Sequence, residues 1–526
     1  MVSAVLFITF FVLLVLNVPI AVCLGLSSAA AILYSGTSLT IVATNIYSGI
    51  SKFLLLAIPF FVLSGNIMAK AGISTRLIRF VDTCVGHRKG GIANVCIIVA
   101  CFFGAISGSG PATVAALGAV LIPAMVERGG FSAAFSTALM ATSSSIAIVI
   151  PPSIAFVVYA SITGVSIGDM FMAGIIPGIL MGLALVVVVM LEVRRNHVVP
   201  SNVEKASAKE RWNAFKDAFW GFLMPIIILG GIYGGFFTPT EAAAVSVVYG
   251  LFVGMVIYKE VKFKDLWEIL IDSAKTTGGI MLIVACASLF SFVCTRFGIS
   301  TAASELLARV AGNQFTFLLI CNIIFLIAGC FIDANSAMYI FIPIMLPVCK
   351  ALGYNVIAFG IMATVNLAIG QVTPPVGVNL FVAIGIKLRD GIRVTLQEIS
   401  RAVVPMVAAS IAVLLIITYI PQISTCLPAA LGSVAAIEND ETVGGDSGTT
   451  QTDNDDFNTI GDYSDLDWAD MTWNFTCSTT ETSTWAQAGR KFGELMEQAT
   501  GGKVKVDVYA ADQLTAVQCC ITAVSV

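Results

Sequence analysis

The sequence predicts an all-α polytopic membrane protein with two inverted repeats, and three observations carry this prediction. Hydrophobic residues make up 57% of the chain and charged residues 11%, whereas about a quarter of the residues in a soluble domain are charged. Apolar runs long enough to span a bilayer recur from residue 1 to about residue 425. Two proline pairs, Pro151-Pro152 and Pro374-Pro375, interrupt corresponding apolar runs in the two halves of the chain.

The apolar segments follow one another with basic connections between them. We expect them at 4–34 (one long or kinked segment, interrupted at Asn17-Val18-Pro19), 53–69, 92–125, 133–160, 171–192, 219–258 (hinged at 237–241, where Thr238 or Thr240 caps the second helix) and 402–422. Lys and Arg gather in a loop at 70–91, a connector at 194–216 and an amphipathic stretch at 259–275. Because Lys and Arg concentrate in cytoplasmic loops, these connections and 387–401 are predicted to lie inside. The last helix then ends outside, which places the C-terminal tail on the extracytoplasmic side.

The second half repeats the first at an offset of about 225 residues. The motif Gly72-Ile73-Ser74-Thr75 occurs again as Gly298-Ile299-Ser300-Thr301, and the second proline pair occupies the position that corresponds to the first. Repeat one covers about 53–192 and repeat two about 277–422. The segment after the opening helix is rich in Lys and Arg in the first copy but not in the second. The two copies are therefore predicted to cross the membrane in opposite senses.

Each proline pair is predicted to break a helix inside the bilayer. Proline removes a backbone donor and clashes with the preceding turn, while Gly370 and Gly377 loosen the second helix further. Free backbone groups at membrane depth are tolerated only where they are buried in protein or line a wet cavity. Such paired breaks are typical of a transporter's ion site. The polar residues around the breaks are Ser143, Ser144, Ser145 and Ser153 in repeat one and Asn366, Gln371, Thr373 and Asn379 in repeat two.

Two polar loops are candidates for re-entrant hairpin tips that bind a hard cation. Ser107-Gly108-Ser109-Gly110 offers hydroxyl and carbonyl oxygens, which such cations prefer; the alternative is a helix contact through small residues. Asp333 is a carboxylate within an apolar run, which is costly and usually functional; the alternative is a structural, hydrogen-bonded aspartate. Asn335 and Ser336 beside it favour a cation site. For Ser143–Ser145, the alternative is hydrogen bonding to the carbonyl four residues back.

The residue pattern argues against an intramembrane enzyme. An aspartyl protease needs two carboxylates that share a proton, and Asp333 alone is predicted at membrane depth. A serine nucleophile needs a base, but His87 and His197 fall in polar loops. The thirteen cysteines lie mostly in apolar segments without a Cys-x-x-Cys motif, which indicates packing. We therefore expect no catalytic residue, no organic cofactor and no nucleic-acid partner. A channel is the alternative to a carrier, and the inverted broken helices favour a carrier.

Six stretches of the chain, taken in order, resemble the large membrane (M) subunit of the TRAP transporters, which are tripartite ATP-independent periplasmic transporters. They are Ala57–Phe61, Gly86–Gly91, Ala105–Gly110, Ile150–Ser153, Ala173–Gly178 and Thr373–Gly377. The resemblance implies an elevator-type symporter in the bacterial inner membrane, with two re-entrant hairpins, coupled to sodium. It implies import of a small organic anion such as a dicarboxylate or sugar acid. It further implies a periplasmic substrate-binding protein (P type) and a small four-helix membrane subunit (Q type) as partners. One departure is Gly110-Pro111, where the family often has a small polar or alanine pair.

Carried onto this sequence, the resemblance implies two sodium sites with a substrate site between them. Na⁺ is the one metal ion expected, and a proton-coupled carrier that uses Asp333 is the alternative. Half-helix N-termini at the breaks are expected to attract the anion through their N–H groups and dipoles. The expected sodium-binding residues are Ser107, Gly108, Ser109, Ser144, Pro151, Asp333, Asn335, Ser336, Gly370, Thr373 and Pro374, and the expected substrate-binding residues are Ser109, Gly110, Pro152, Ser153, Asn335, Asn366, Pro375 and Asn379.

The C-terminal tail differs in composition from the membrane domain, which we place at 1–427. Residues 429–526 hold 16 of the chain's 32 Asp and Glu but 4 of its 28 Lys and Arg. We expect an acidic disordered linker at 428–467, followed by a truncated domain at 468–526. Its pattern predicts a strand at 471–476, a helix at 484–500 and a strand at 503–509. This order resembles the first β-α-β unit of a TRAP substrate-binding protein. So short a piece cannot form a two-lobed receptor, and we expect it to be marginally folded.

Overall fold

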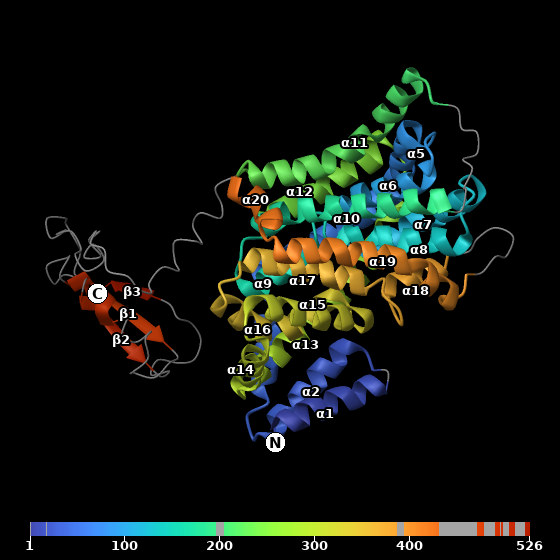
Figure 1. Ribbon diagram of the computed structural model, residues 1–526. Coiled ribbons are helices and arrows are strands. Elements are labelled where there is room, and N and C mark those ends of the chain that lie inside the picture. Colours follow the sequence, from blue (N-terminus) through green and yellow to red (C-terminus); the bar gives the residue numbers. More distant parts are fainter. Residues whose placement is uncertain are drawn as a thin grey trace, which may run out of the picture. The chain divides into compact units, whose positions relative to one another are not determined.

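The computed structural model describes residues 2–16, 18–195, 205–386 and 394–430, and in the tail 471–477, 490–494, 496–497, 504–510 and 521–525. The chain divides into two units, Met1–Asp440 and Glu441–Val526. Over its described residues the first unit is helical, and nine of its helical segments there are long and apolar enough to cross a membrane (Figure 1). The prediction of a polytopic helical membrane protein is confirmed for this unit.

Three helices and a short 3-10 helix precede the core of repeat one. The apolar run at 4–34 forms two helices that pack against each other, not the single long or kinked segment that we expected. Pro19 immediately precedes the second of them, because proline ends one helix and is tolerated where the next begins. The elements are α1 (Val2–Val15), α2 (Ile20–Tyr34), α3 (Thr40–Ile50) and η1 (Phe53–Leu56).

The two repeats have the same order of elements. A left-handed glycine, Gly72 (φ 67°) or Gly298 (φ 68°), precedes a 13-residue arm helix in each copy. A helical hairpin, a broken helix and a long closing helix follow. Repeat one holds α4 (Ala57–Lys70), α5 (Ile73–Val85), α6 (Gly91–Ser107), α7 (Gly110–Glu127), α8 (Ala133–Ser145), η2 (Ile146–Ile148), α9 (Ile154–Thr163) and α10 (Ile167–Arg195). Repeat two holds α13 (Phe263–Arg296), α14 (Ile299–Ala311), α15 (Gln314–Phe331), α16 (Ala334–Ala351), α17 (Val356–Gly370), α18 (Val378–Ile384) and α19 (Leu396–Tyr419).

The two arm helices lie at opposite ends of the membrane-crossing bundle. In Figure 1 the long helices run across the picture, with α5 at the right end and α14 at the left. Equivalent elements of the repeats therefore lie at opposite ends of the bundle, as an inverted repeat requires. Between the repeats lie α11 (Ala208–Tyr233), α12 (Pro239–Phe252) and a π-helical turn, η3 (Val253–Ile257), and α20 (Gln422–Ala430) follows α19.

Two of the basic connections are more helical than expected. The segment at 70–91, predicted as a loop, contains α5, and the stretch at 263–275 is the start of the uninterrupted helix α13. Charged side chains do not prevent a helix when apolar residues recur on one face, and in α5 Ile73, Leu77 and Val81 are all buried. The hinge at 237–241 is confirmed: the Thr238 hydroxyl accepts the Glu241 N–H at 3.3 Å, and the Glu241 carboxylate accepts the Thr238 N–H at 2.8 Å.

Each hairpin packs against the broken helix of its own repeat through residues without bulky side chains. A Cβ on Gly104 of α6 would lie 2.6 Å from the Cα of Ala147 in η2. A Cβ on Gly370 of α17 would lie 2.5 Å from the Cα of Gly329 in α15. Small residues let membrane helices approach this closely. The broken helices are also the most enclosed, because every residue of α17 from Ile357 to Gly370 is buried.

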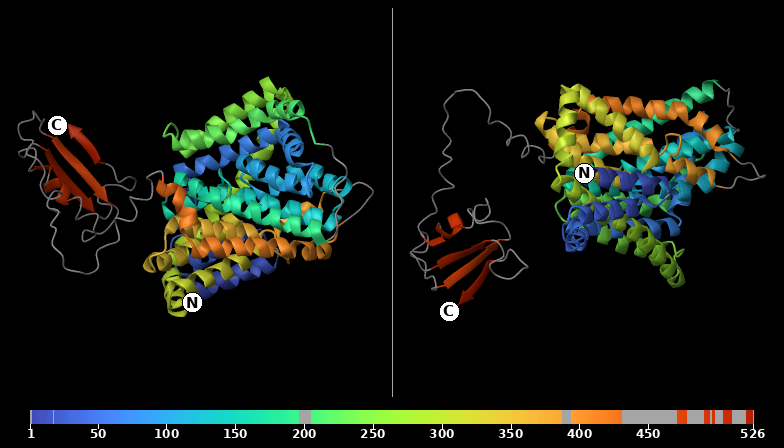
Figure 2. Two further views of the ribbon diagram at one scale, coloured as in Figure 1. Left: turned by 45° about the horizontal axis from the view of Figure 1, so that its top comes forward. Right: turned by 90° about the horizontal axis from the view of Figure 1, so that it is seen from below.

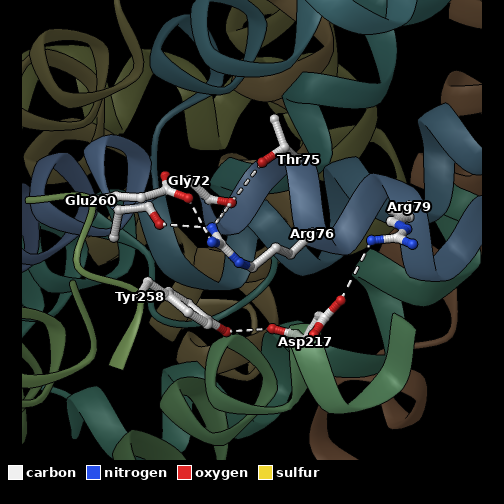
Figure 3. Close-up of polar contacts among 8 residues, drawn as sticks. Gly72, Thr75, Arg76, Arg79, Asp217, Tyr258 and Glu260 are labelled. Atoms are coloured by element: carbon white, nitrogen blue, oxygen red, sulfur yellow. Dashed lines mark hydrogen bonds and ion pairs between the residues drawn. The ribbon is translucent and has the colours of Figure 1, made fainter. Parts of the chain in front are cut away.

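Charged and aromatic contacts fasten the arm helix α5 to the connections around it (Figure 3). The guanidinium of Arg76 donates to Glu260 Oε1 at 2.5 Å and to the carbonyl of Gly72 at 3.0 Å, and it lies 3.9 Å from the centre of the Tyr258 ring. Burial raises the pKa of Tyr258 to about 12, so its hydroxyl stays protonated and donates to the Asp217 carbonyl at 2.6 Å. On the opposite arm, the Ser304 hydroxyl donates to the Ile344 carbonyl at 2.7 Å.

The second unit contains a three-stranded sheet, seen in red in Figure 2. The strands are β1 (Met471–Cys477), β2 (Val504–Ala510) and β3 (Ile521–Ser525), in the order β2-β1-β3. β1 and β2 are parallel, and they lie where the alternation of apolar residues predicted strands. β3, antiparallel to β1, was not predicted. Most of the predicted linker and of the helix at 484–500 falls outside the described residues, and 428–430 belong to α20. The likeness to a substrate-binding protein stays a prediction.

The contact between Gly370 and Gly329 predicts a large cost for an added methyl group. In Gly370→Ala, the new Cβ meets backbone, so α15 and α17 must separate, and we expect a loss of about 1–3 kcal/mol of stability. The thermal unfolding midpoint in detergent measures this. Gly278→Ala in α13 is the matched control, because a Cβ there meets no atom within 4 Å. An equal midpoint for both variants would contradict the packing described above.

The contacts of Arg76 predict that it, and not its neighbour Arg79, holds the arm. Arg76→Gln removes an ion pair and a cation–π contact, and we expect a loss of about 1 kcal/mol that shrinks in high salt. Arg79 has a 70% exposed side chain and a 3.5 Å ion pair with Asp217, so Arg79→Gln is the matched control with a small expected effect. Unfolding midpoints at low and high salt decide between the two; a loss in Arg79→Gln as large as in Arg76→Gln would count against this assignment.

Candidate functional site

Both helices are interrupted at the proline pairs, as predicted. α8 ends at Ser145, and after the short η2 turn the chain resumes its helix at Ile154 in α9. α17 ends at Gly370, and α18 begins at Val378. The peptide bonds Pro151-Pro152 and Pro374-Pro375 are both cis. Each break therefore leaves several residues of non-helical backbone between two half-helices.

The tip of the first hairpin lies directly on the first break. α6 ends at Ser107, Gly108 takes a left-handed conformation (φ 60°), and Ser109 precedes the first residue of α7. A Cβ on Gly108 would lie 2.8 Å from the carbonyl oxygen of Pro152. The structure thus brings the Ser107–Gly110 tip and the proline pair together.

A threonine that the sequence analysis did not single out organises the first tip. The Thr113 hydroxyl, on α7, donates to the Ser109 carbonyl at 2.8 Å and lies 2.8 Å from Ser107 Oγ. Thr113 is fully buried. Its signal in the sequence is a polar residue one helical turn after Ser109 within an apolar run. Three neutral oxygens, from Ser107, Ser109 and Thr113, are thereby held close together.

The serines around the first break differ in their hydrogen bonding. Ser144 Oγ donates to the Ala141 carbonyl at 2.6 Å, and Ser145 Oγ donates to the Thr142 carbonyl at 2.8 Å. These bonds are local, as the alternative for these serines supposed, but they reach three residues back and not four. Ser143 Oγ, by contrast, is buried and has no hydrogen-bond partner among the described residues. Ser153 caps α9, since its hydroxyl accepts the Phe156 N–H at 3.5 Å.

Asp333 caps the second half of hairpin two. Its carboxylate accepts the N–H groups of Asn335 and Ser336, each at 3.1 Å, and the Ser336 hydroxyl at 2.5 Å. These contacts correspond to the structural alternative that we gave for Asp333. Asn335 Oδ1 is buried without a hydrogen-bond partner among the described residues, so this tip keeps an unused oxygen.

The second break is joined to hairpin two a few residues before its tip. Gly377 N–H donates to the carbonyl of Cys330, the residue after Gly329, at 3.3 Å. The Thr373 hydroxyl donates to the Ile369 carbonyl at 2.7 Å, and Gln371 Oε1 is buried without a partner in the described part of the chain. The break thus holds a buried amide oxygen beside its free backbone.

Two asparagines of repeat two serve different contacts. Asn366 Nδ2 donates to the backbone carbonyl and to Oδ1 of Asn322 in α15, at 2.9 and 2.8 Å. Asn379 Nδ2 instead donates to Ser144 Oγ of repeat one, at 3.1 Å, and a Cβ on Gly110 would lie 2.7 Å from the same nitrogen. Asn379 therefore brings together the first tip, the first break and the second break.

A buried carboxylate, Asp169, was not expected. It lies in the first turn of α10, where its N–H donates to Ser166 Oγ at 3.3 Å. With Tyr233 it lines a cavity of about 570 Å³ between the starts of α10 and α12. Asp169 therefore belongs to the beginning of a spanning helix, and it is separate from the hairpin tips and from the breaks.

The chemistry of the assembled groups suits a hard cation. Hydroxyl, amide and carbonyl oxygens predominate around the tips and breaks, and hard cations prefer oxygen ligands. Within the described ranges there is no group of three or more His, Cys, Asp and Glu side chains that could hold a transition metal.

Comparison with known proteins assigns the chain to a family. Residues 7–423 match the family described as the DctM component of the tripartite ATP-independent periplasmic transporters. The chain is 38% identical to the C4-dicarboxylate TRAP transporter large permease protein DctM of Rhodobacter capsulatus, over 80% of this chain and 97% of that protein. It is 34% identical to the 2,3-diketo-L-gulonate TRAP transporter large permease protein YiaN of Escherichia coli, over 76% and 95%.

A solved structure shares the fold. The YdaH transporter of Alcanivorax borkumensis superimposes with a TM-score of 0.52 over 76% of this chain and 88% of that one, at 15% sequence identity. The resemblance noted in the sequence is thus confirmed for the membrane unit, which is a transporter subunit and not an enzyme. The chain belongs to the DctM family, the large permease subunits of the tripartite ATP-independent periplasmic transporters.

Proposed function

We propose that this large permease imports a small organic anion by coupling its movement to sodium. The observation that carries the proposal is the contact of the Gly108 backbone with the Pro152 carbonyl, which sets hairpin oxygens against the free backbone of a broken helix. Relatives are named for C4-dicarboxylates, 2,3-diketo-L-gulonate, sialic acid and isethionate, all of them small anions. A small organic acid is therefore the substrate class that we assign to this chain.

One cation site is assigned to the first tip and break. Ser107, Ser109 and Thr113 supply oxygens from the tip, and Ser144 and the carbonyls around Pro151 supply oxygens from the break. The buried Ser143 hydroxyl lies in the same helix turn, next to the Cys96 thiol. Neutral hydroxyl and carbonyl oxygens can replace part of the hydration shell of Na⁺, because hard cations prefer oxygen ligands.

The second site is assigned to the tip at 333–336 and the break at 370–374. Here the Asp333 carboxylate contributes a negative charge and accepts the backbone N–H groups of Asn335 and Ser336. Asn335 Oδ1 and Gln371 Oε1 are buried oxygens without a hydrogen-bond partner among the described residues, and they would bind the cation. Thr373 and the carbonyls near Pro374 complete the oxygen set.

The substrate carboxylate is assigned to the start of α7. Helix N-termini attract anions through their N–H groups and dipole. The N-terminus of α9 is already capped by Ser153 and that of α16 by Asp333. Neither Ser109 of α7 nor Gly377 of α18 makes a side-chain cap, and α7 is the longer of these two helices. Ser109, Gly110 and Asn379 would line one side of this site, and Pro152, Ser153, Asn335, Asn366 and Pro375 are the further residues that we assign to it.

The partners and the motion follow the TRAP arrangement. A periplasmic binding protein would deliver the anion, and a small four-helix subunit would brace the scaffold in the inner membrane. Both hairpins and both broken helices would then slide inward together, as the close glycine packing between each hairpin and its break allows. The tail would lie outside. A proton-coupled carrier, with Asp333 as its proton site, is the alternative mechanism.

Sodium coupling predicts the driving force for uptake. Proteoliposomes that contain the permease, its small membrane subunit and the binding protein are expected to accumulate a labelled organic acid when Na⁺ is outside and pH is clamped. A panel of dicarboxylates and sugar acids identifies the substrate. Uptake driven by a proton gradient in the absence of Na⁺ would overturn sodium coupling and favour the alternative.

The role assigned to Asp333 predicts a change in sodium affinity. Asp333→Asn keeps the size of the side chain but removes the charge and one acceptor, so we expect half-saturation of uptake at a Na⁺ concentration about tenfold higher, or about 1.4 kcal/mol. Asp217→Asn, a 52% exposed carboxylate by the arm helix, is the matched control. Unchanged sodium affinity in Asp333→Asn would remove Asp333 from the site.

A further inference from the structure

We propose that Asn379 couples the two repeats, so that cation binding at the first break and closure of the second break favour each other. This inference rests on the proposed sodium coupling and adds a specific consequence to it, namely that sodium acts cooperatively and that Asn379 is the positioning residue responsible. The coupling would pass through one buried amide that contacts repeat one with its side chain and closes repeat two with its backbone.

The side chain of Asn379 reaches into repeat one. Asn379 and Ser144 are both fully buried, and Nδ2 donates to Ser144 Oγ at 3.1 Å across 235 residues of sequence. Ser144 gives its own hydroxyl hydrogen to the Ala141 carbonyl at 2.6 Å. Ser144 Oγ is therefore the acceptor, and the amide nitrogen has to face it. This fixes the orientation of the amide.

The same nitrogen lies against the first hairpin tip. A Cβ on Gly110 would lie 2.7 Å from Asn379 Nδ2 and 3.1 Å from Oδ1, so the whole amide rests on the glycine backbone at the start of α7. Asn379 thus orients the lone pairs of Ser144 Oγ and positions the first hairpin tip. The first cation site needs both.

The backbone of Asn379 belongs to the second break. Its N–H donates to the Gln371 carbonyl at 3.1 Å, which closes the loop that contains Pro374 and Pro375. When the second break opens, this bond is lost and α18 is free to shift. The side-chain amide of Asn379 must then move away from Ser144 and Gly110, because α18 carries both the backbone and the side chain of Asn379.

This arrangement makes the coupling reciprocal. A cation held by Ser144 and the first tip stabilises the position of Asn379, and through it the closed second break. A cation bound at the second site stabilises the same closed break, and the first site is then already arranged for binding. Linkage requires that each site raise the affinity of the other by the same factor. The expected signature is a Hill coefficient for Na⁺ above 1.

The test is sodium-dependent uptake in the reconstituted complex with Asn379→Leu, which keeps the branching of the side chain and removes both polar groups. We expect the Hill coefficient to fall from near 2 toward 1 and half-saturation to need several-fold more Na⁺. Gly110→Ala, which displaces the amide, is expected to have the same effect. In the double variant Ser144→Ala, Asn379→Leu, the loss of sodium affinity should be smaller than the sum of the single losses.

Asn322→Leu is the matched control, because it removes a buried amide whose side-chain hydrogen bonds stay among α15, α17 and α19. It is expected to lower the thermal midpoint and leave the Hill coefficient as in the wild type. A purely structural Asn379 would behave like this control, and that result would overturn the coupling. A wild-type Hill coefficient of 1 would overturn it as well, with sodium coupling intact. Wild-type uptake that needs no Na⁺ would instead overturn the proposed function.

Discussion

Unpaired backbone at membrane depth is the constraint on which the rest of this structure depends. A broken helix exposes N–H and C=O groups that lipid cannot satisfy, so protein has to enclose them. Here each break is covered by a hairpin of its own repeat: the Pro152 carbonyl lies under Gly108, and Gly377 N–H finds the Cys330 carbonyl. The hairpins, the small residues that let them approach, and the long helices around them all serve this enclosure.

The two repeats enclose their breaks with chemically different hairpin tips. Repeat one places neutral hydroxyls at its tip, whereas repeat two adds one carboxylate, Asp333, and uses it to cap its own helix. With a sodium ion at each site, these groups would carry a net charge of +1. An enclosed positive charge is costly in a membrane unless a counter-charge joins it. An anionic substrate would supply that counter-charge, so the proposed ions and cargo stabilise each other.

The sequence predicted the features that have a local signal and missed those that depend on distant contacts. Pro-Pro pairs, the repeated Gly-Ile-Ser-Thr motif and the Thr238 cap each act within a few residues, and the breaks, the duplication and the hinge were found. The helix α5 was missed because its charged residues resemble a loop. The cap made by Asp333 looks the same in sequence as a cation ligand. The bond from Asn379 to Ser144 spans 235 residues and leaves no local trace.

The two arm helices differ in one respect: among the described residues, ion pairs add to the apolar packing of α5 but not to that of α14. On the side assigned to the cytoplasm, α5 is held by ion pairs such as Arg76 with Glu260, while no ion pair described for the first unit involves α14. Dissolved salt weakens the attraction between exposed charges, with a screening length of about 8 Å at physiological ionic strength, but it leaves apolar packing nearly unchanged. Osmotic stress that concentrates the cell interior would therefore weaken the ion pairs of α5 while its apolar contacts with α11, and the contacts of α14, stay as they are.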